Sequence, residues 1–233
     1  MRSVSETEER SSGVSLPRPS DFVAAAGLLT FLPLQSPEPR AAAFGRAAPL
    51  LPLIGVLVGG VLAGVDWLIA EASPAWISAV VLAALWEAIG RGGLRQAHPE
   101  PSRSAALAVV AKAVLLTFLP VPRLLPLLLA PLLGAWSIVV LAVGARDAAV
   151  ITRKLAPGVL FNEFAIASLV TFAVVFDVAA GLGIFVVVTA AAVVLGLRLY
   201  LHERIGGLSA PWLVRGAQLI ELLTLALLIP FQA

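Results

Sequence analysis

Residues 164–201 read FAIASLVTFAVVFDVAAGLGIFVVVTAAAVVLGLRLYL, and this run decides the fold class. It is 38 residues long and carries only two charged side chains. A membrane-spanning helix needs about 20 residues, with a range of roughly 17–25, so the run is too long for one crossing. Asp177 and the Gly181-Leu182-Gly183 turn divide it. We therefore predict a helical hairpin made of Phe164–Ala180 and Ile184–Tyr200.

The composition of the whole chain agrees with this interpretation. Of its 233 residues, 60% are hydrophobic and only 13% are charged, whereas soluble domains are about 25% charged. So few charges cannot cover the surface of an ordinary soluble domain, and so much apolar surface excludes a disordered chain. We predict an all-α, polytopic integral membrane protein whose first partner is the lipid bilayer.

Five further stretches have the length of a spanning helix, which gives about seven spans in total. They are Pro49–Ala70, Pro74–Gly90, Ala105–Val121, Leu124–Gly144 and Trp212–Pro230. An eighth apolar stretch, Phe22–Leu34, is only about 13 residues long, which is too short to span, so we expect it to be re-entrant or interfacial. The organisation predicted is a flexible cytoplasmic arm, residues 1–20, before a single transmembrane domain, residues 21–233.

The positions of Lys and Arg predict the orientation. If Phe22–Leu34 returns to the side it enters from and the seven others cross, 14 of the 16 basic residues share one face. By the positive-inside rule that face is cytoplasmic, so we expect the N-terminus inside and the C-terminus outside. Arg123 falls on the opposite face and Lys112 falls within a span. The fourteen are Arg2, Arg10, Arg18, Arg40, Arg46, Arg91, Arg95, Arg103, Arg146, Arg153, Lys154, Arg198, Arg204 and Arg215. The polar start, without a basic region leading into an apolar one, is not typical of a cleaved leader.

The first span carries two pairs of glycines at the spacing that brings membrane helices together. Gly55 and Gly59 form one pair, and Gly60 and Gly64 form the other. Small residues four apart let two helix backbones approach closely in lipid. Glycine is also simply frequent in membrane helices, so both interpretations stay open for these four residues.

Five ionisable residues fall within the predicted spans. Asp66, Glu87 and Asp177 lie near span ends, and we expect them to reach interfacial water. Lys112 lies about 10 Å into its span from the cytoplasmic side and Glu221 about 14 Å into its own. Similar depth and opposite sign predict an ion pair, either structural or part of a polar cavity, and make these two the candidate catalytic residues.

Several kinds of site find no support in the residues present. The chain has no Cys, and its two His, His98 and His202, lie among charged or Pro residues, so we expect solvated loop histidines and no metal or cofactor site. No stripe of Lys and Arg alternates with aromatic residues, which argues against nucleic acid as a partner. Phosphate-binding, nucleophile-elbow and zinc-helix motifs are absent from the sequence, so no catalytic constellation can be assembled.

Four segments, taken in order, resemble the cobalamin synthase family, adenosylcobinamide-GDP ribazoletransferase. Phe22-Val-Ala-Ala-Ala-Gly-Leu-Leu-Thr-Phe-Leu-Pro33 is similar to the family's F-L-T-x-L-P element. Pro52-Leu-Ile-Gly-Val-Leu-Val-Gly59 is similar to its P-x-x-G-x-x-x-G helix, and Ala130-Pro-Leu-Leu-Gly-Ala-Trp136 to its P-x-x-G-R-W element. Ile205-Gly-Gly-Leu-Ser is similar to its G-G-x-T-G-D loop, which is followed by a helix with a late Glu, here Glu221. The resemblance implies a polytopic inner-membrane enzyme of cobalamin biosynthesis that uses Mg²⁺.

The chain departs from the family where the metal chemistry is expected. The segment that in the family is rich in His, Asp and Gly corresponds here to residues 91–104, which contain no Asp. Pro211 replaces the Asp of the T-G-D loop and Ala135 replaces the Arg of the G-R-W element. Mg²⁺ prefers oxygen ligands, above all carboxylates, so these departures predict an eroded metal site.

Two functional interpretations follow from the resemblance and its departures. The first is a non-catalytic structural or accessory subunit that packs against a larger membrane-protein complex or forms a homo-oligomer. The second is a divergent adenosylcobinamide-GDP ribazoletransferase, for which Mg²⁺ would be needed. The missing aspartates favour the first.

Overall fold

The computed structural model describes residues 18–30, 40–90, 102–143, 159, 161–205 and 210–232, and within them the chain is helical, as predicted. The helices are α1 (Pro19–Leu29), α2 (Arg40–Ala47), the 3₁₀ turn η1 (Ala48–Leu50), α3 (Leu51–Ala70), α4 (Ala75–Ile89), α6 (Ser102–Thr117), α7 (Leu124–Ala142), α8 (Phe161–Ile205) and α9 (Ala210–Gln232). The predicted all-α membrane fold is therefore confirmed.

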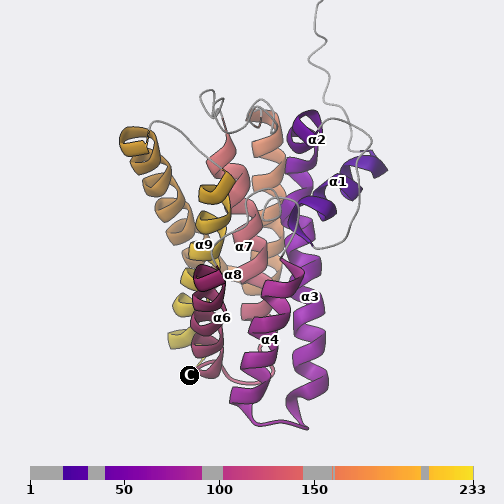
Figure 1. Cartoon of the computed structure of the whole chain (residues 1–233), viewed down its shortest axis with the longest axis vertical. Helices are drawn as coiled ribbons and strands as arrows, with labels where there is room; N and C mark the ends of the chain where they lie inside the picture. The colour runs from indigo at the N-terminus through magenta and orange to yellow at the C-terminus, as the bar shows by residue number, and fades with distance from the viewer. Residues whose placement is uncertain are drawn as a thin grey trace, which may run out of the picture.

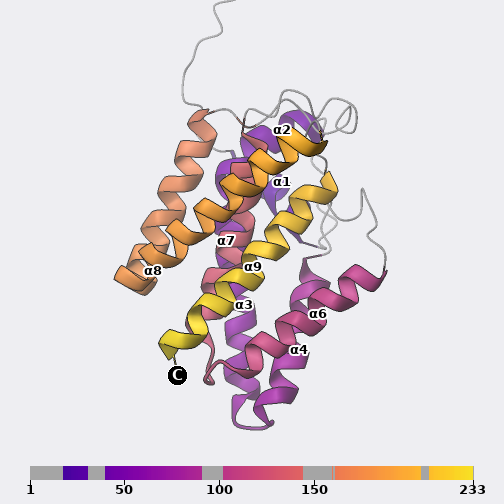
Figure 2. The same ribbon diagram turned by 90° about the vertical axis from the view of Figure 1, so that its left-hand side faces the viewer.

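Helix α7 forms the centre of the bundle, with α3, α8 and α9 packed around it (Figures 1 and 2). Its sequence is apolar on every side, which is typical of a helix buried all round. Of the residues in its most apolar 18-residue stretch, 83% are buried. The corresponding share is 50% for α9 and 28% for α8, which lie further out. The core of the protein is therefore a helix that contacts protein rather than lipid.

The glycines of α3 explain how closely α3 and α7 approach. A methyl group on Gly55 would lie 2.6 Å from the carbonyl oxygen of Pro131, and one on Gly59 would clash with that of Leu127. Only glycine permits this contact between backbones. Gly60 and Gly64 have no atom within 4 Å of where a methyl group would stand. Of the two pairs, Gly55 and Gly59 pack against α7, whereas Gly60 and Gly64 meet no other element of the described chain. A packing role for Gly60 and Gly64 stays a prediction.

The long apolar run at residues 164–201 folds back on itself. Helix α8 bends at Ala180, where φ is 44° and ψ is −127°, and its two arms run antiparallel (Figure 2). The bend lies one residue before the predicted Gly181-Leu182-Gly183 turn, so the hairpin is confirmed. A methyl group on Gly183 would lie 2.7 Å from the carbonyl oxygen of Val175, so the turn needs a glycine there.

Seven helical segments of the described chain correspond to the seven predicted spans, because α8 supplies two arms, and two of the seven are shorter than predicted. Four described helical segments are long and apolar enough to cross a membrane: Phe44–Ala70, Leu124–Ala142, Phe161–Glu203 and Pro211–Phe231. The predicted spans Pro74–Gly90 and Ala105–Val121 are instead the shorter helices α4 and α6, of 15 and 16 residues. At 1.5 Å per residue, each covers about 22–24 Å of a hydrocarbon core of roughly 30 Å. Gly90 ends α4, and α6 ends just before Pro120, because neither residue favours a helix interior.

The N-terminal apolar stretch does not span. Helix α1 has 11 residues and lies beside α2, at the end of the bundle away from the C-terminus (Figures 1 and 2). The carboxylate of Asp21 accepts a hydrogen bond from the backbone N–H of Arg18 at 2.8 Å, which caps the helix. The other oxygen of Asp21 lies 3.2 Å from Arg46 Nε on α2. This ion pair holds α1 against α2.

Candidate functional site

Three helices bring together three charged side chains in the interior of the bundle. Lys112 on α6 donates a hydrogen bond to Glu87 Oε1 on α4, with 2.7 Å between the atoms. The same Nζ lies 2.6 Å from Glu221 Oε2 on α9. The Lys112–Glu221 contact predicted from depth and sign is therefore present, and Glu87 is its third member. We call Glu87, Lys112 and Glu221 the charged triad.

The triad is almost completely shielded from solvent. Lys112 is fully buried, and the side chains of Glu87 and Glu221 are 4% and 13% exposed. The Lys112 ammonium also lies 4.2 Å from the centre of the Trp86 ring, a cation–π contact that strengthens when water is excluded. A buried ammonium needs such compensation because an unpaired charge in an apolar interior is costly.

The expectation for Glu87 is wrong. We expected it to reach interfacial water, yet it faces α6 and holds Lys112. Its position two residues before the end of α4 indicated its depth but not the side of the helix on which it lies. The side is set by packing of α4 against α6, which a single apolar helix of low amphipathicity does not reveal. The neighbouring Trp86 was missed for the same reason.

Glu221 keeps hydrogen-bonding capacity despite its ion pair. Its Oε2 is paired with Lys112 Nζ at 2.6 Å, and a carboxylate oxygen has a second lone pair that can accept a further hydrogen bond. The side chain lies over Gly134 of α7, where a methyl group would stand 2.7 Å from Glu221 Cγ. Gly134 therefore makes the space that Glu221 occupies.

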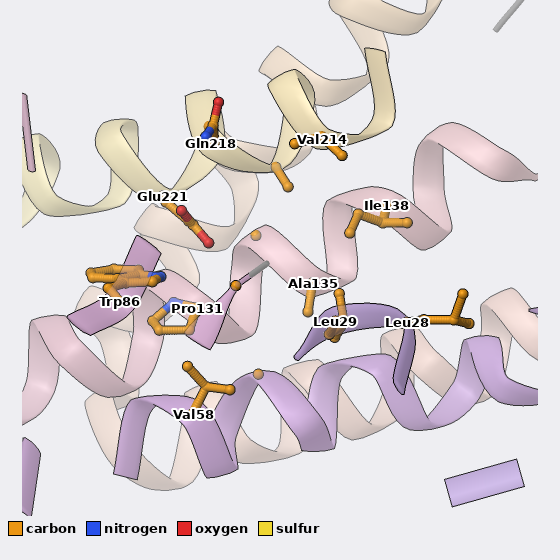
Figure 3. Close-up of a pocket in the computed structure, with 14 residues that line it drawn as sticks. Leu28, Leu29, Val58, Trp86, Pro131, Ala135, Ile138, Val214, Gln218 and Glu221 are labelled. Atoms are coloured by element: carbon orange, nitrogen blue, oxygen red, sulfur yellow. The ribbon is translucent and has the colours of Figure 1, made fainter. Parts of the chain in front are cut away.

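A pocket of about 70 Å³ adjoins the triad and includes Glu221 in its wall. Figure 3 shows Glu221 pointing from α9 toward α7 and α3, and the residues that line the pocket come from α1, α3, α4, α7 and α9. Apart from Glu221 and Gln218, the wall consists of apolar residues and glycines. They are Leu28, Leu29, Gly55, Val58, Trp86, Gly90, Pro131, Gly134, Ala135, Ile138, Val214 and Ala217. An apolar pocket with few polar groups is the usual form of a small-molecule site.

Gln218 is a pocket residue that sequence reasoning missed. It is 9% exposed and its side-chain nitrogen, Nε2, has no hydrogen-bond partner. It precedes Glu221 by three residues, so the two share one face of α9. That spacing was a usable signal once Glu221 had been singled out.

A second buried ion pair joins Asp66 of α3 to Arg123, which precedes α7. Asp66 accepts hydrogen bonds of 2.7 Å from the Arg123 guanidinium and from its backbone N–H. The guanidinium also donates to the Leu116 and Ala75 carbonyls and to Ser78. Asp66 and Arg123 are both fully buried. We expected Asp66 to reach interfacial water, and this expectation is corrected because Arg123 neutralises Asp66 inside the protein. The side of the membrane on which Arg123 lies stays a prediction.

The remaining predicted residues divide into two groups. Asp177 is exposed near the bend of α8, as expected, and His202 is exposed on α8. Several predicted features lie outside the described residues: His98, the segment 91–101, the glycine loop at 206–209 and residues 1–17 of the predicted arm. Many of the basic residues that predicted the orientation also lie outside them. Three described basic residues lie in helix ends that are far from the C-terminus (Figure 2). They are Arg46 on α2, Arg198 near the end of α8 and Arg215 near the start of α9.

The described side chains do not fit the divalent cation that the family resemblance implies. In the parts of the chain that the structure covers, no three His, Asp or Glu side chains form a group that could hold a metal. The two carboxylates that do converge, Glu87 and Glu221, already face the Lys112 ammonium. A cation placed beside them would meet a fixed positive charge at a few ångströms.

Residues 21–94 match the family model of cobalamin-5-phosphate synthase. This segment, in the N-terminal part of the chain, is similar to the cobalamin synthase family. No curated protein and no solved structure matches the chain.

The matched residues include two of the four segments on which the resemblance was based. They contain α1 and the Gly55–Gly59 part of α3, together with α4 and Glu87. The cobalamin synthase resemblance is thereby confirmed over this segment. Four features lie beyond the matched segment: Lys112, Glu221, the segment Ala130–Trp136 and the loop at 206–209. Their correspondence to cobalamin synthase stays a prediction.

Proposed function

We propose that this chain is a non-catalytic, cobalamin synthase-like membrane protein, an accessory subunit that packs against a larger membrane-protein complex of the inner membrane. The observation that carries the proposal is the position of the Lys112 ammonium between Glu87 and Glu221. The intramembrane carboxylates that could attract Mg²⁺ are thus compensated by the chain itself.

The sequence supports the same proposal. The cobalamin synthase match ends at residue 94, within the segment 91–104 where the family has its acidic residues and this chain has no Asp. The positions equivalent to the Asp of the family's glycine loop and the Arg of its tryptophan element hold Pro211 and Ala135. A fold can persist after its chemistry is lost, because packing and catalysis depend on different residues.

The α8 hairpin offers the broadest apolar surface for packing against a partner. Only 28% of its most apolar window is buried within this chain. Leu169 and Phe176, for example, are 71% and 63% exposed. Lipid can cover such a surface, and so can the apolar helices of another membrane protein.

The accessory role is tested by crosslinking in the intact membrane. A photo-crosslinking amino acid at position 169 should join the chain to one recurring membrane protein, whereas the same amino acid at the buried position 190 should not. That protein should also become less abundant when the chain is deleted. Adducts with lipid alone, or no effect of deletion, would contradict the accessory role.

The second candidate is a divergent adenosylcobinamide-GDP ribazoletransferase, favoured by the pocket beside Glu221 in a cobalamin synthase-like bundle. Membranes containing the chain are supplied with adenosylcobinamide-GDP, α-ribazole phosphate and Mg²⁺, and the corrinoid product is measured. We expect no more product than in membranes without the chain. Product that disappears in Glu221→Gln would establish the transferase instead.

A further inference from the structure

The pocket beside the triad presents one unused donor and one carboxylate with acceptor capacity to spare. Gln218 Nε2 is buried and has no hydrogen-bond partner within the described chain. Glu221 Oε2 contacts Lys112 Nζ at 2.6 Å and has a second lone pair that can accept a further hydrogen bond. The two residues come from neighbouring positions on the same face of α9 and both line the pocket (Figure 3). Buried polar groups in proteins are normally satisfied, so an unsatisfied amide beside a carboxylate in one pocket indicates something that binds there.

The two atoms select the chemistry of that ligand. A hydroxyl group can accept a hydrogen bond from Gln218 and donate one to Glu221, which uses both atoms at once. A carboxylate or phosphate is disfavoured by the negative charge of Glu221. An ammonium is disfavoured because Lys112 already supplies the positive charge that Glu221 needs.

The rest of the pocket suits an apolar body attached to that hydroxyl. Leu28 and Leu29 of α1, Val58 of α3 and Ile138 of α7 form its walls. A volume of about 70 Å³ exceeds what one water molecule needs, and apolar walls offer water few partners. An alkyl chain gains contact with these walls that water cannot gain.

We propose that this pocket is a binding site for an alcohol, whose hydroxyl bridges Gln218 and Glu221 and whose alkyl body lies against α1, α3 and α7. The alcohol is either a membrane lipid with a free hydroxyl, such as a diacylglycerol, or a small soluble alcohol. The two sources share the same hydroxyl chemistry. The proposal does not depend on whether the chain is an accessory subunit or an enzyme.

The test is photolabelling of the full-length chain in lipid nanodiscs with a diazirine-bearing octanol, followed by peptide mass spectrometry. We expect adducts on pocket residues of α7 and α9, and about fivefold less labelling there with the same diazirine on octane, which lacks the hydroxyl. Both probes should label the outer face of α8 equally. Equal labelling of the pocket by the two probes, or none by octanol, would overturn the proposal.

Two variants and a control make the result specific. Gln218→Leu removes the donor and should reduce pocket labelling about fivefold, and Val58→Trp should reduce it by filling the pocket. Leu219→Ala changes an outward-facing neighbour, 45% exposed, and should leave labelling unchanged. Unreduced labelling in folded Gln218→Leu would refute the site.

Competition separates the two sources. Loss of pocket labelling on adding diacylglycerol assigns the site to a lipid, and loss on adding 1-butanol alone assigns it to a soluble alcohol. Competition by neither compound would refute the proposal.

Discussion

Lys112 Nζ and Glu221 Oε2 lie 2.6 Å apart, although the two residues belong to α6 and α9 and are distant in the sequence. Glu87 completes the arrangement from α4. Three helices are thus joined at one buried point. The consequences of this geometry, and of three others in the fold, can be measured.

Removal of the Lys112 charge should destabilise the protein. Lys112→Met leaves two buried carboxylates without their cation, and the cost expected for breaking a buried pair is about 3–5 kcal/mol. Thermal unfolding in detergent measures it. The triple variant Glu87→Gln, Lys112→Met, Glu221→Met should be more stable than Lys112→Met alone, because no unpaired charge remains. A triple variant less stable than Lys112→Met would show that the triad does not act as an electrostatic unit.

Gly59 and Gly60 are adjacent in the sequence and differ in what a methyl group would meet. Gly59→Ala should destabilise by about 1–3 kcal/mol, because the methyl group would clash with the α7 backbone at Leu127. Gly60→Ala should stabilise by about 0.5–1 kcal/mol, since alanine favours the helix and its methyl group meets open space. Unfolding temperatures of the two variants, compared side by side, test this. Similar effects at both positions would argue against the α3–α7 contact.

Arg123 should not be replaceable by lysine. Its side chain and backbone N–H donate five hydrogen bonds around Asp66. A lysine has no planar fork with which to reach the same acceptors, so Arg123→Lys should destabilise by about 2–4 kcal/mol. Arg215→Lys, at an exposed site on α9, is the control and should leave the unfolding temperature nearly unchanged. A tolerated Arg123→Lys would mean that charge alone, without geometry, holds Asp66.

A glycine at the bend of α8 should increase the stability of the protein. Ala180 has a φ of 44°, where a side chain is strained, so Ala180→Gly should stabilise the hairpin by about 1 kcal/mol. Ala173→Gly, in the exposed interior of the same helix, should instead destabilise by about 1 kcal/mol. Calorimetric or light-scattering melts in detergent distinguish the two signs. Destabilisation by Ala180→Gly would show that residue 180 does not adopt the positive φ at the bend.

The sequence by itself determined where helices form and where the long apolar run must fold back. It also predicted the Lys112–Glu221 contact, because depth follows from 1.5 Å of rise per residue and a buried charge requires an opposite one. Only the tertiary structure decided that Glu87 joins this pair, that Asp66 and Arg123 neutralise each other, and that Gly59 faces α7 whereas Gly60 faces outward. The physical reason is that helices apolar on all sides carry no signal of which side faces a neighbour. Sequence position sets depth along the helix axis, and rotation about that axis is set by packing.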